Sequence, residues 1–310
     1  MKTRDGEASM MRGLVEKVTS SIGAMLANKG SLGNDFEAIR QHVLLRISEV
    51  PVGQFPFYHL YIDKLFPDAY FEALWEQMRE FKVPEKMQAR TQDNDAFVNR
   101  RYPLARSSEL TIRQFRAIWE DSEVKLALFK KFYVNPTPAM MNEIEIHKKE
   151  FEFVFSEPGR FQNIHVDIPP KYMSFVFYFP KEPLSDEDEL KNATVLYDSD
   201  LNPVHNARFR KNSVCIFVPH FHSYHGFSTT IERDVLVMFM MNATDQKHWH
   251  EVLKLKKDRA PDFDATLHLI EQKLARNPLI EYGTDPKDLE AARKACRINA
   301  PRGRVMLDLE

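Results

Sequence analysis

Five short runs of aromatic and β-branched residues between positions 151 and 241 constrain the fold more than any other feature of the sequence. The runs are FEFVF (151–155), YMSFVFYF (172–179), ATVLY (193–197), SVCIFV (213–218) and DVLVMFMM (234–241). Clusters of Pro, Gly, Asn and Asp separate them, as is typical of turns between strands. Several short strands of this kind predict an antiparallel sandwich, barrel or jelly roll. The acidic stretch at 183–192 between two runs is predicted to be a solvated loop.

Helical patterns flank this β-rich centre on both sides, because apolar residues recur there three and four positions apart. The predicted helices cover residues 11–28, 36–47 (with Asp35 as cap), 68–78, 112–132 and three stretches after Asp245. An alternating aromatic strand at 55–63 precedes the third helix, and a polar, irregular stretch at 91–108 precedes the fourth. The order is therefore helices, a β core, then helices, which is an α+β organisation.

Composition narrows the functional classes. The 310 residues are 43% hydrophobic and 28% charged, as in ordinary soluble proteins. The first residues carry acids where a signal peptide needs an apolar core, and no stretch approaches the ~18 apolar residues of a membrane helix. Two cysteines, Cys215 and Cys296, are too few for a disulfide framework, which favours a reducing, cytoplasmic location. A net charge of −2 without a basic stripe gives no reason to expect nucleic acid.

Two polar clusters stand out among the eleven histidines. The first holds His165 and Asp167, and the second, between two predicted strands, holds His220, His222, His225 and Arg233. Side chains at i and i+2 of a strand point to one face, so an imidazole and a carboxylate can reach the same ion. A third ligand, an imidazole from a distant strand, would complete a set of two His and one carboxylate, which holds Fe(II) with open positions. Both His222 and His225 lie close enough before Arg233 in the sequence to supply this second imidazole.

These segments resemble the Fe(II)/2-oxoglutarate-dependent oxygenases, in particular their prolyl-hydroxylase-like branch. In that family a Pro-Gly pair and an aromatic residue precede an H-x-D motif, as Pro158, Gly159 and Phe161 precede His165 here. The next strand ends with a tyrosine, matched by Tyr178. The second metal segment contains Ser-Tyr-His-Gly, matched at 223–226, before a basic residue that opens a hydrophobic strand. The resemblance spans roughly residues 55–245.

The resemblance implies a double-stranded β-helix (jelly roll) core with N-terminal and C-terminal helices. The corresponding domains are an N-terminal helical extension at 1–50, a jelly-roll oxygenase domain at 51–245 and a C-terminal helical extension at 246–310. The terminal helices are candidate surfaces for a homo-oligomer or another partner.

The resemblance also implies roles for single residues. His165, Asp167 and His225 would ligate iron; Arg233 would pair with the distal carboxylate of 2-oxoglutarate, and Tyr178 would add a hydrogen bond to it. His225 is preferred to His222 because it stands in the Ser-Tyr-His-Gly pattern, where the following glycine permits a turn. The sequence departs from the family in two places: Val235 and Val237 replace a hydroxyl residue after the arginine, and Asn192-Ala193 replaces a Gly-Gly pair.

The implied function is a dioxygenase that hydroxylates an unactivated C–H bond of a small-molecule or tethered organic substrate. Its cofactors would be Fe(II), 2-oxoglutarate as co-substrate and O2, with ascorbate as a candidate reductant, and its other products succinate and CO2. A carboxylate at Asp167 favours hydroxylation or desaturation, since halogenating relatives carry a small residue there. The alternatives are a non-catalytic cupin-like binding or interaction protein on the same scaffold, and a cupin-like isomerase or hydrolase with another divalent metal, in which Arg233 has no role.

Overall fold

The computed structural model describes residues 35–83, 88–91, 98–133, 136–147, 151–165, 167, 171–198, 202–204, 206–219 and 223–242. The helices predicted at 11–28 and after Asp245, together with His220 and His222, lie outside these ranges. No helix within them is long and apolar enough to cross a membrane.

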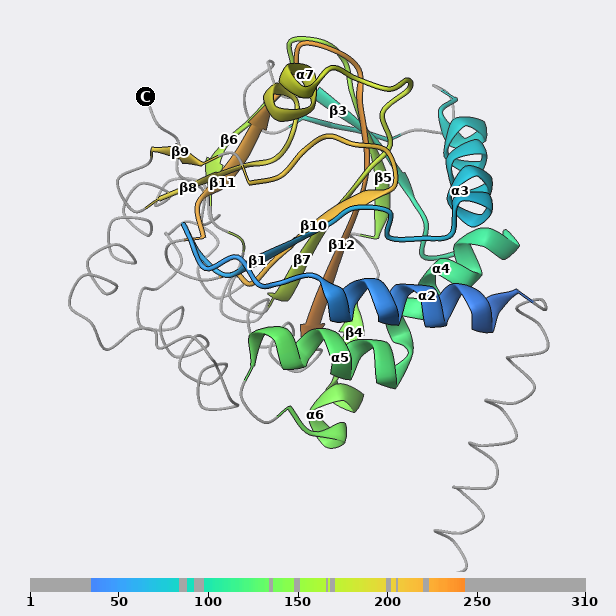
Figure 1. Cartoon of the computed structure of the whole chain (residues 1–310). Helices are drawn as coiled ribbons and strands as arrows, with labels where there is room; N and C mark the ends of the chain where they lie inside the picture. The colour runs from blue at the N-terminus through green and yellow to red at the C-terminus, as the bar shows by residue number, and fades with distance from the viewer. Residues whose placement is uncertain are drawn as a thin grey trace, which may run out of the picture.

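Two antiparallel sheets form the centre of the described fold (Figure 1). The eight-stranded sheet has the order β1 (His59–Ile62), β10 (Ser213–Phe217), β7 (Lys171–Tyr178), β12 (Arg233–Asn242), β5 (Glu152–Ser156), β3 (Val98–Pro103) and β2 (Gln88–Thr91), with β4 (Ile144–Ile146) paired separately to β12. The four-stranded sheet has the order β6 (Phe161–His165), β11 (His225–Ser228), β8 (Val195–Tyr197) and β9 (Pro203–Val204). Each of the five predicted β runs coincides with a strand.

Side chains of the large sheet alternate between two apolar clusters, because successive residues of a strand point to opposite faces. One face joins the main core under the helices, with members Phe175, Phe177, Val214, Ile216, Leu236 and Met238. The other face joins a second cluster, with members Tyr178, Cys215, Phe217 and Val235, which also includes Leu196 of the small sheet. The small sheet therefore covers the face opposite the helices.

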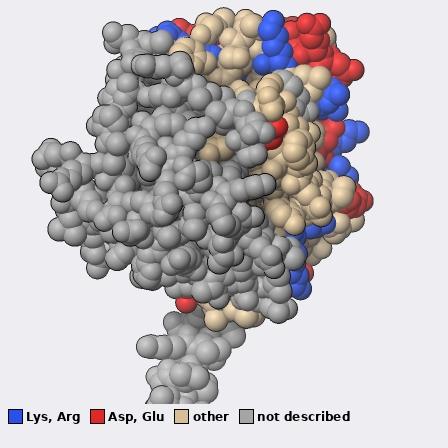
Figure 2. All heavy atoms as spheres, turned by 90° about the vertical axis from the view of Figure 1, so that its left-hand side faces the viewer, with Lys and Arg blue, Asp and Glu red and all other residues tan. Residues whose placement is uncertain are grey.

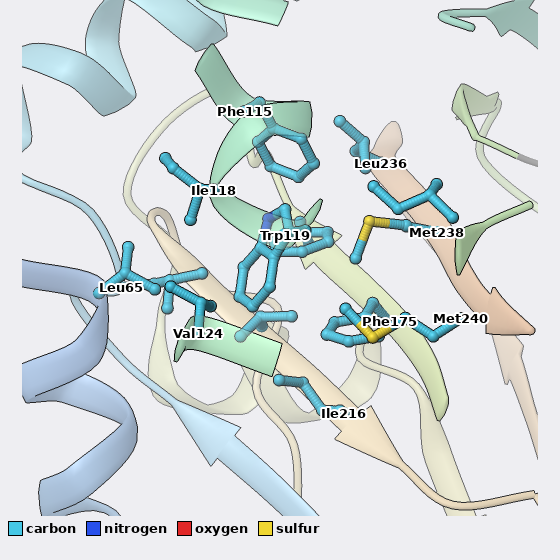
Figure 3. Close-up of a cluster of buried hydrophobic side chains, with 14 of the residues drawn as sticks. Leu65, Phe115, Ile118, Trp119, Val124, Phe175, Ile216, Leu236, Met238 and Met240 are labelled. Carbon is cyan, nitrogen blue, oxygen red and sulfur yellow. The ribbon is translucent and has the colours of Figure 1, made fainter. Parts of the chain in front are cut away.

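Helices cover the first of these faces. They are α2 (Phe36–Glu49), α3 (Asp68–Phe81), α4 (Leu110–Glu120), α5 (Ser122–Phe132) and α6 (Pro138–Glu143). Figure 3 shows how α4 seals the sheet: Trp119 lies among side chains of β7 and β12, with its ring centroid 5.3 Å from that of Phe175. The buried residues of α2 belong to the same core.

The single helix predicted over 112–132 is in fact two helices, α4 and α5. Asp121 between them has an extended backbone, and its carboxylate accepts the backbone N–H groups of Glu123 and Val124. An aspartate in this geometry caps the start of a new helix. Asp35, predicted to cap α2, makes no such side-chain bond.

Two stretches predicted to lack regular structure contain elements. The polar stretch at 91–108 includes β3, which pairs with both β2 and β5. The acidic stretch at 183–192 includes α7 (Asp186–Lys191), which begins where the Ser185 hydroxyl accepts the N–H of Asp188. Glu189 of α7 is buried and pairs with Arg210, so this helix is fixed by a distant partner.

Charges of both signs are mixed over the described surface. On the face shown in Figure 2, coloured Lys and Arg atoms lie beside coloured Asp and Glu atoms without a large field of either sign. Arg208, for example, pairs with Asp186 at 2.8 Å. Surface ion pairs of this kind contribute little stability individually.

Candidate active site

The two motif segments meet in the small sheet. β6 and β11 pair antiparallel, and their register places His165 directly opposite His225, although the two lie 60 positions apart (225 − 165). Asp167 follows two residues after His165. The side chain of His165 lies outside the described part of the structure, so the geometry below concerns Asp167 and His225.

His225 presents an unprotonated nitrogen to Asp167. Its Nδ1 lies 2.8 Å from the carbonyl oxygen of Ser223, which can only accept, so Nδ1 carries the proton. Burial lowers the pKa of His225, although the Asp167 carboxylate opposes that shift. The neutral ring therefore directs the lone pair of Nε2 toward Asp167 Oδ2, 3.8 Å away.

This pair of atoms fits a divalent cation. Metal bonds to imidazole nitrogen and carboxylate oxygen are about 2.0–2.2 Å, so one ion can touch both atoms when they are 3.8 Å apart. Imidazole together with carboxylate is the ligand chemistry of non-haem Fe(II). The described side chains alone contain no group of three or more such ligands.

The Asp167 carboxylate is held from the large sheet. Lys171 Nζ lies 2.7 Å from Oδ1, and the Ser174 hydroxyl donates to Oδ2. The Lys171 ammonium also lies 3.3 Å from the centre of the Phe239 ring. These contacts fix which carboxylate oxygen faces His225.

A β-bulge brings Lys171 to this face. Met173 pairs with Met240 and Lys171 with Met241, so Tyr172 is the extra residue on its strand. Tyr172 and Met173 both belong to the helix-side core. An extra residue reverses the alternation, and Lys171 therefore shares the face of Ser174.

A buried guanidinium lies at the other end of the space between the sheets. Arg233 is 2% exposed; its Nε donates to the carbonyl of Asn192 and its Nη2 to the hydroxyl of Thr194, each at 3.0 Å. The Phe227 ring covers it, 4.0 Å from Cζ. No carboxylate among the described residues pairs with it, and burial lowers the pKa of Arg233 to about 10. The Tyr178 hydroxyl is a further hydrogen-bond partner of the guanidinium, so its described partners are all uncharged groups.

Tyr178 lies beside this guanidinium. Its buried ring is 5.8 Å from Arg233 Cζ, and its hydroxyl accepts the N–H of Thr194 at 3.3 Å. Asn192, noted as a departure from the family, connects the same region: its side-chain oxygen accepts the N–H of Thr230 at 2.7 Å while its carbonyl binds Arg233.

Strand β11 connects the two parts of the site, the Asp167–His225 pair and the Arg233 guanidinium. His225 and Phe227 are two residues apart on this strand, and its register with β6 shifts between them. Phe227 covers Arg233, and the His225 ring packs on Phe217 of the large sheet with centroids 4.4 Å apart. The structure thus places Asp167 beside His225, and Tyr178 beside Arg233, with Phe217 and Phe227 of the two sheets packed on His225 and Arg233.

Comparisons with known proteins give matches in fold. No family model matches the sequence, and no curated protein matches it. A prolyl-4-hydroxylase from Pseudomonas putida is 13% identical with a TM-score of 0.45, and the match covers 64% of this chain and 97% of that one. A Trichoplax adhaerens prolyl hydroxylase, solved with a hypoxia inducible factor peptide fragment, is 10% identical with a TM-score of 0.46 over 68% and 92%.

A third similar structure is HygX from Streptomyces hygroscopicus, solved with nickel, 2-oxoglutarate and hygromycin B. It is 11% identical with a TM-score of 0.40, and the match covers 60% of this chain and 83% of that one. Two of these three similar structures are prolyl hydroxylases, and the third was solved with 2-oxoglutarate bound.

Proposed function

We propose that this chain is an Fe(II)- and 2-oxoglutarate-dependent oxygenase with a jelly-roll core, which hydroxylates a C–H bond of an organic substrate. The observation that supports it most strongly is Arg233. A fully buried guanidinium without a carboxylate partner in the described structure is costly unless an anion binds to it. The N–H groups that Asn192, Thr194 and Tyr178 do not use suit the planar carboxylate of a dicarboxylic acid.

The pair formed by Asp167 and His225 is the second observation that supports the proposal. Asp167 and His225 present one oxygen and one nitrogen to the same point, and the register places His165 opposite His225. With His165 as third ligand they form the proposed iron site. On this proposal a single anion contacts the metal with one end and Arg233 with the other, since His225 packs on Phe217 of the large sheet and Arg233 packs under Phe227 of the small sheet.

The bound iron and 2-oxoglutarate would supply the oxidising chemistry, with succinate and CO2 as products. The protein's own residues would orient these groups. Arg233, anchored by Asn192 and Thr194, would hold the distal carboxylate, and Tyr178 would donate a hydrogen bond to it. The Phe217 and Phe227 rings would exclude water from the space between them.

The assignment is tested by measuring succinate formation from 2-oxoglutarate by the iron-loaded protein. We expect turnover by the wild type and loss of it in His165→Ala and Asp167→Ala. His42→Ala is the control, because His42 is a half-buried histidine of α2, on the helix side of the large sheet, whose Nε2 lies 3.1 Å from the carbonyl oxygen of Lys64. Equal succinate formation by all four proteins would contradict the assignment.

Binding measurements separate the alternatives. A non-catalytic interaction protein should retain no iron after anaerobic reconstitution and show no absorption band that depends on 2-oxoglutarate. A cupin-like isomerase or hydrolase should bind a divalent metal but keep its activity in Arg233→Met. The proposed oxygenase should bind 2-oxoglutarate only in the presence of a divalent metal.

A further inference from the structure

Lys171 places a buried positive charge against the carboxylate proposed to bind the metal. Its side chain is 7% exposed and that of Asp167 is 8% exposed, so water screens this ion pair poorly. The ammonium contacts Oδ1, while Oδ2 faces His225. Two cations, one from the chain and one from solution, would therefore share a single carboxylate.

Two residues of β7 act on Asp167 in different ways. Ser174 is neutral and donates a hydrogen bond to Oδ2, so it orients the carboxylate without opposing a cation. Lys171 also orients it, but its charge repels a divalent ion at the far oxygen. Since Ser174 would still hold the carboxylate without Lys171, the charge should decide the effect of Lys171 on affinity.

The surroundings give the ammonium a second favourable contact. Lys171 Nζ lies over the Phe239 ring at 3.3 Å, and a buried cation over an aromatic face is stabilised by it. Phe239 stands directly opposite Ser174 in the register of β12 and β7. The bulge at Tyr172 and the Phe239 ring of β12 therefore hold the Lys171 ammonium next to Asp167 and His225.

We infer that Lys171 is an internal counter-ion of Asp167 that weakens the binding of a divalent cation and so sets the metal affinity of the site. The inference rests on the proposed metal site. Lys171 and Ser174 touch the two oxygens of one carboxylate, and their removal should change metal affinity in opposite directions.

The test is calorimetric titration of the full-length, metal-free protein with Mn²⁺. Lys171→Met should bind Mn²⁺ about tenfold more tightly than the wild type or better, because the repulsion is gone. Ser174→Ala should bind it about tenfold more weakly, as expected when a hydrogen bond to a ligand is removed. Lys171→Arg keeps the charge and should stay within about threefold of the wild type.

The matched control is Lys82→Met. Lys82 also pairs with a buried aspartate, Asp234, at 2.8 Å and lies over a phenyl ring, that of Phe155, at 5.6 Å. Its removal should leave Mn²⁺ affinity unchanged. If Lys171→Met does not fold, Lys171→Gln can replace it, since the amide can still donate to Oδ1 without a charge.

The outcomes are distinguishable. Tighter binding by Lys171→Met with weaker binding by Ser174→Ala supports the inference. Unchanged or weaker binding by Lys171→Met, when the wild type binds Mn²⁺ through Asp167, overturns the inference and leaves the proposed function standing. If neither the wild type nor Lys171→Met binds Mn²⁺, or if Asp167→Ala binds it as well as the wild type, both the inference about Lys171 and the proposed function are overturned.

Discussion

Replacing Arg233 with lysine tests how the proposed co-substrate is held. In the structure Nε donates to Asn192, Nη2 donates to Thr194, and Tyr178 is a further hydrogen-bond partner. We propose that the remaining N–H groups of Nη1 and Nη2 hold the carboxylate. An ammonium has one nitrogen with three hydrogens. If two of them satisfy the same two acceptors, one remains for the ligand, so a single charged hydrogen bond is lost.

The expected magnitude follows from that count. A hydrogen bond to a charged group contributes about 1.5–3 kcal/mol, so the Kd for 2-oxoglutarate should rise about 10- to 150-fold in Arg233→Lys. Arg233→Met, which leaves the carboxylate without a buried counter-charge, should cost about 3–5 kcal/mol and abolish measurable binding.

The assay is anaerobic calorimetric titration of the Mn²⁺-loaded protein with 2-oxoglutarate. Arg40→Lys is the control, because Arg40 also donates two hydrogen bonds to one carboxylate, that of Glu37, but lies on α2 on the helix side of the large sheet. Its Kd should match the wild type. A change of less than about threefold in Arg233→Lys, or an equal change in Arg40→Lys, would refute the assignment of the remaining N–H groups of Arg233 to the co-substrate.

Three further predictions concern the scaffold. Asp121→Ala should lower the free energy of unfolding by about 1 kcal/mol in urea denaturation, whereas Asp121→Asn, which can still cap α5, should lose less; equal losses would contradict the cap. Burial lowers the pKa of His59, so below about pH 6.5 the unfolded chain takes up a proton that the folded protein resists, and stability should fall as the pH drops. In thermal scans between pH 7.5 and 5.5, the melting temperature of His59→Gln should fall less steeply with pH than that of the wild type. An identical dependence on pH in the two proteins would show that His59 does not cause the loss of stability. Burial raises the pKa of the Cys215 thiol to about 12, so in a Cys296→Ser background iodoacetamide should label it only after denaturation. Rapid labelling of the folded protein would contradict that burial.

The strands of the core could be predicted from the sequence because they are continuous aromatic and β-branched runs. The stretch 172–179, for example, falls on β7 (Lys171–Tyr178). The hairpin of β2 and β3 escaped prediction because its residues are polar. β3 is extended through pairing with β5, where Arg101 meets Glu152 across the strands, and a distant partner of this kind leaves no local pattern.

The candidate site was predictable in part. Spacing drew attention to Asp167 and His225, and the structure brings them together. Asn192 was visible only as a departure from the resemblance, although its carbonyl anchors Arg233. Lys171 carried no signal, since a lysine four residues after an aspartate is ordinary on a surface, and a bulge cannot be inferred from alternation alone.

That bulge decides to which side of the strand Lys171 points. If the strand slipped by one residue, so that Tyr172 rather than Lys171 stood opposite Met241, the uninterrupted pleat would turn the lysine toward the helices. Asp167 would then face a cation from solution without the resident ammonium. The register of this strand end therefore decides whether the site carries a positive charge of its own.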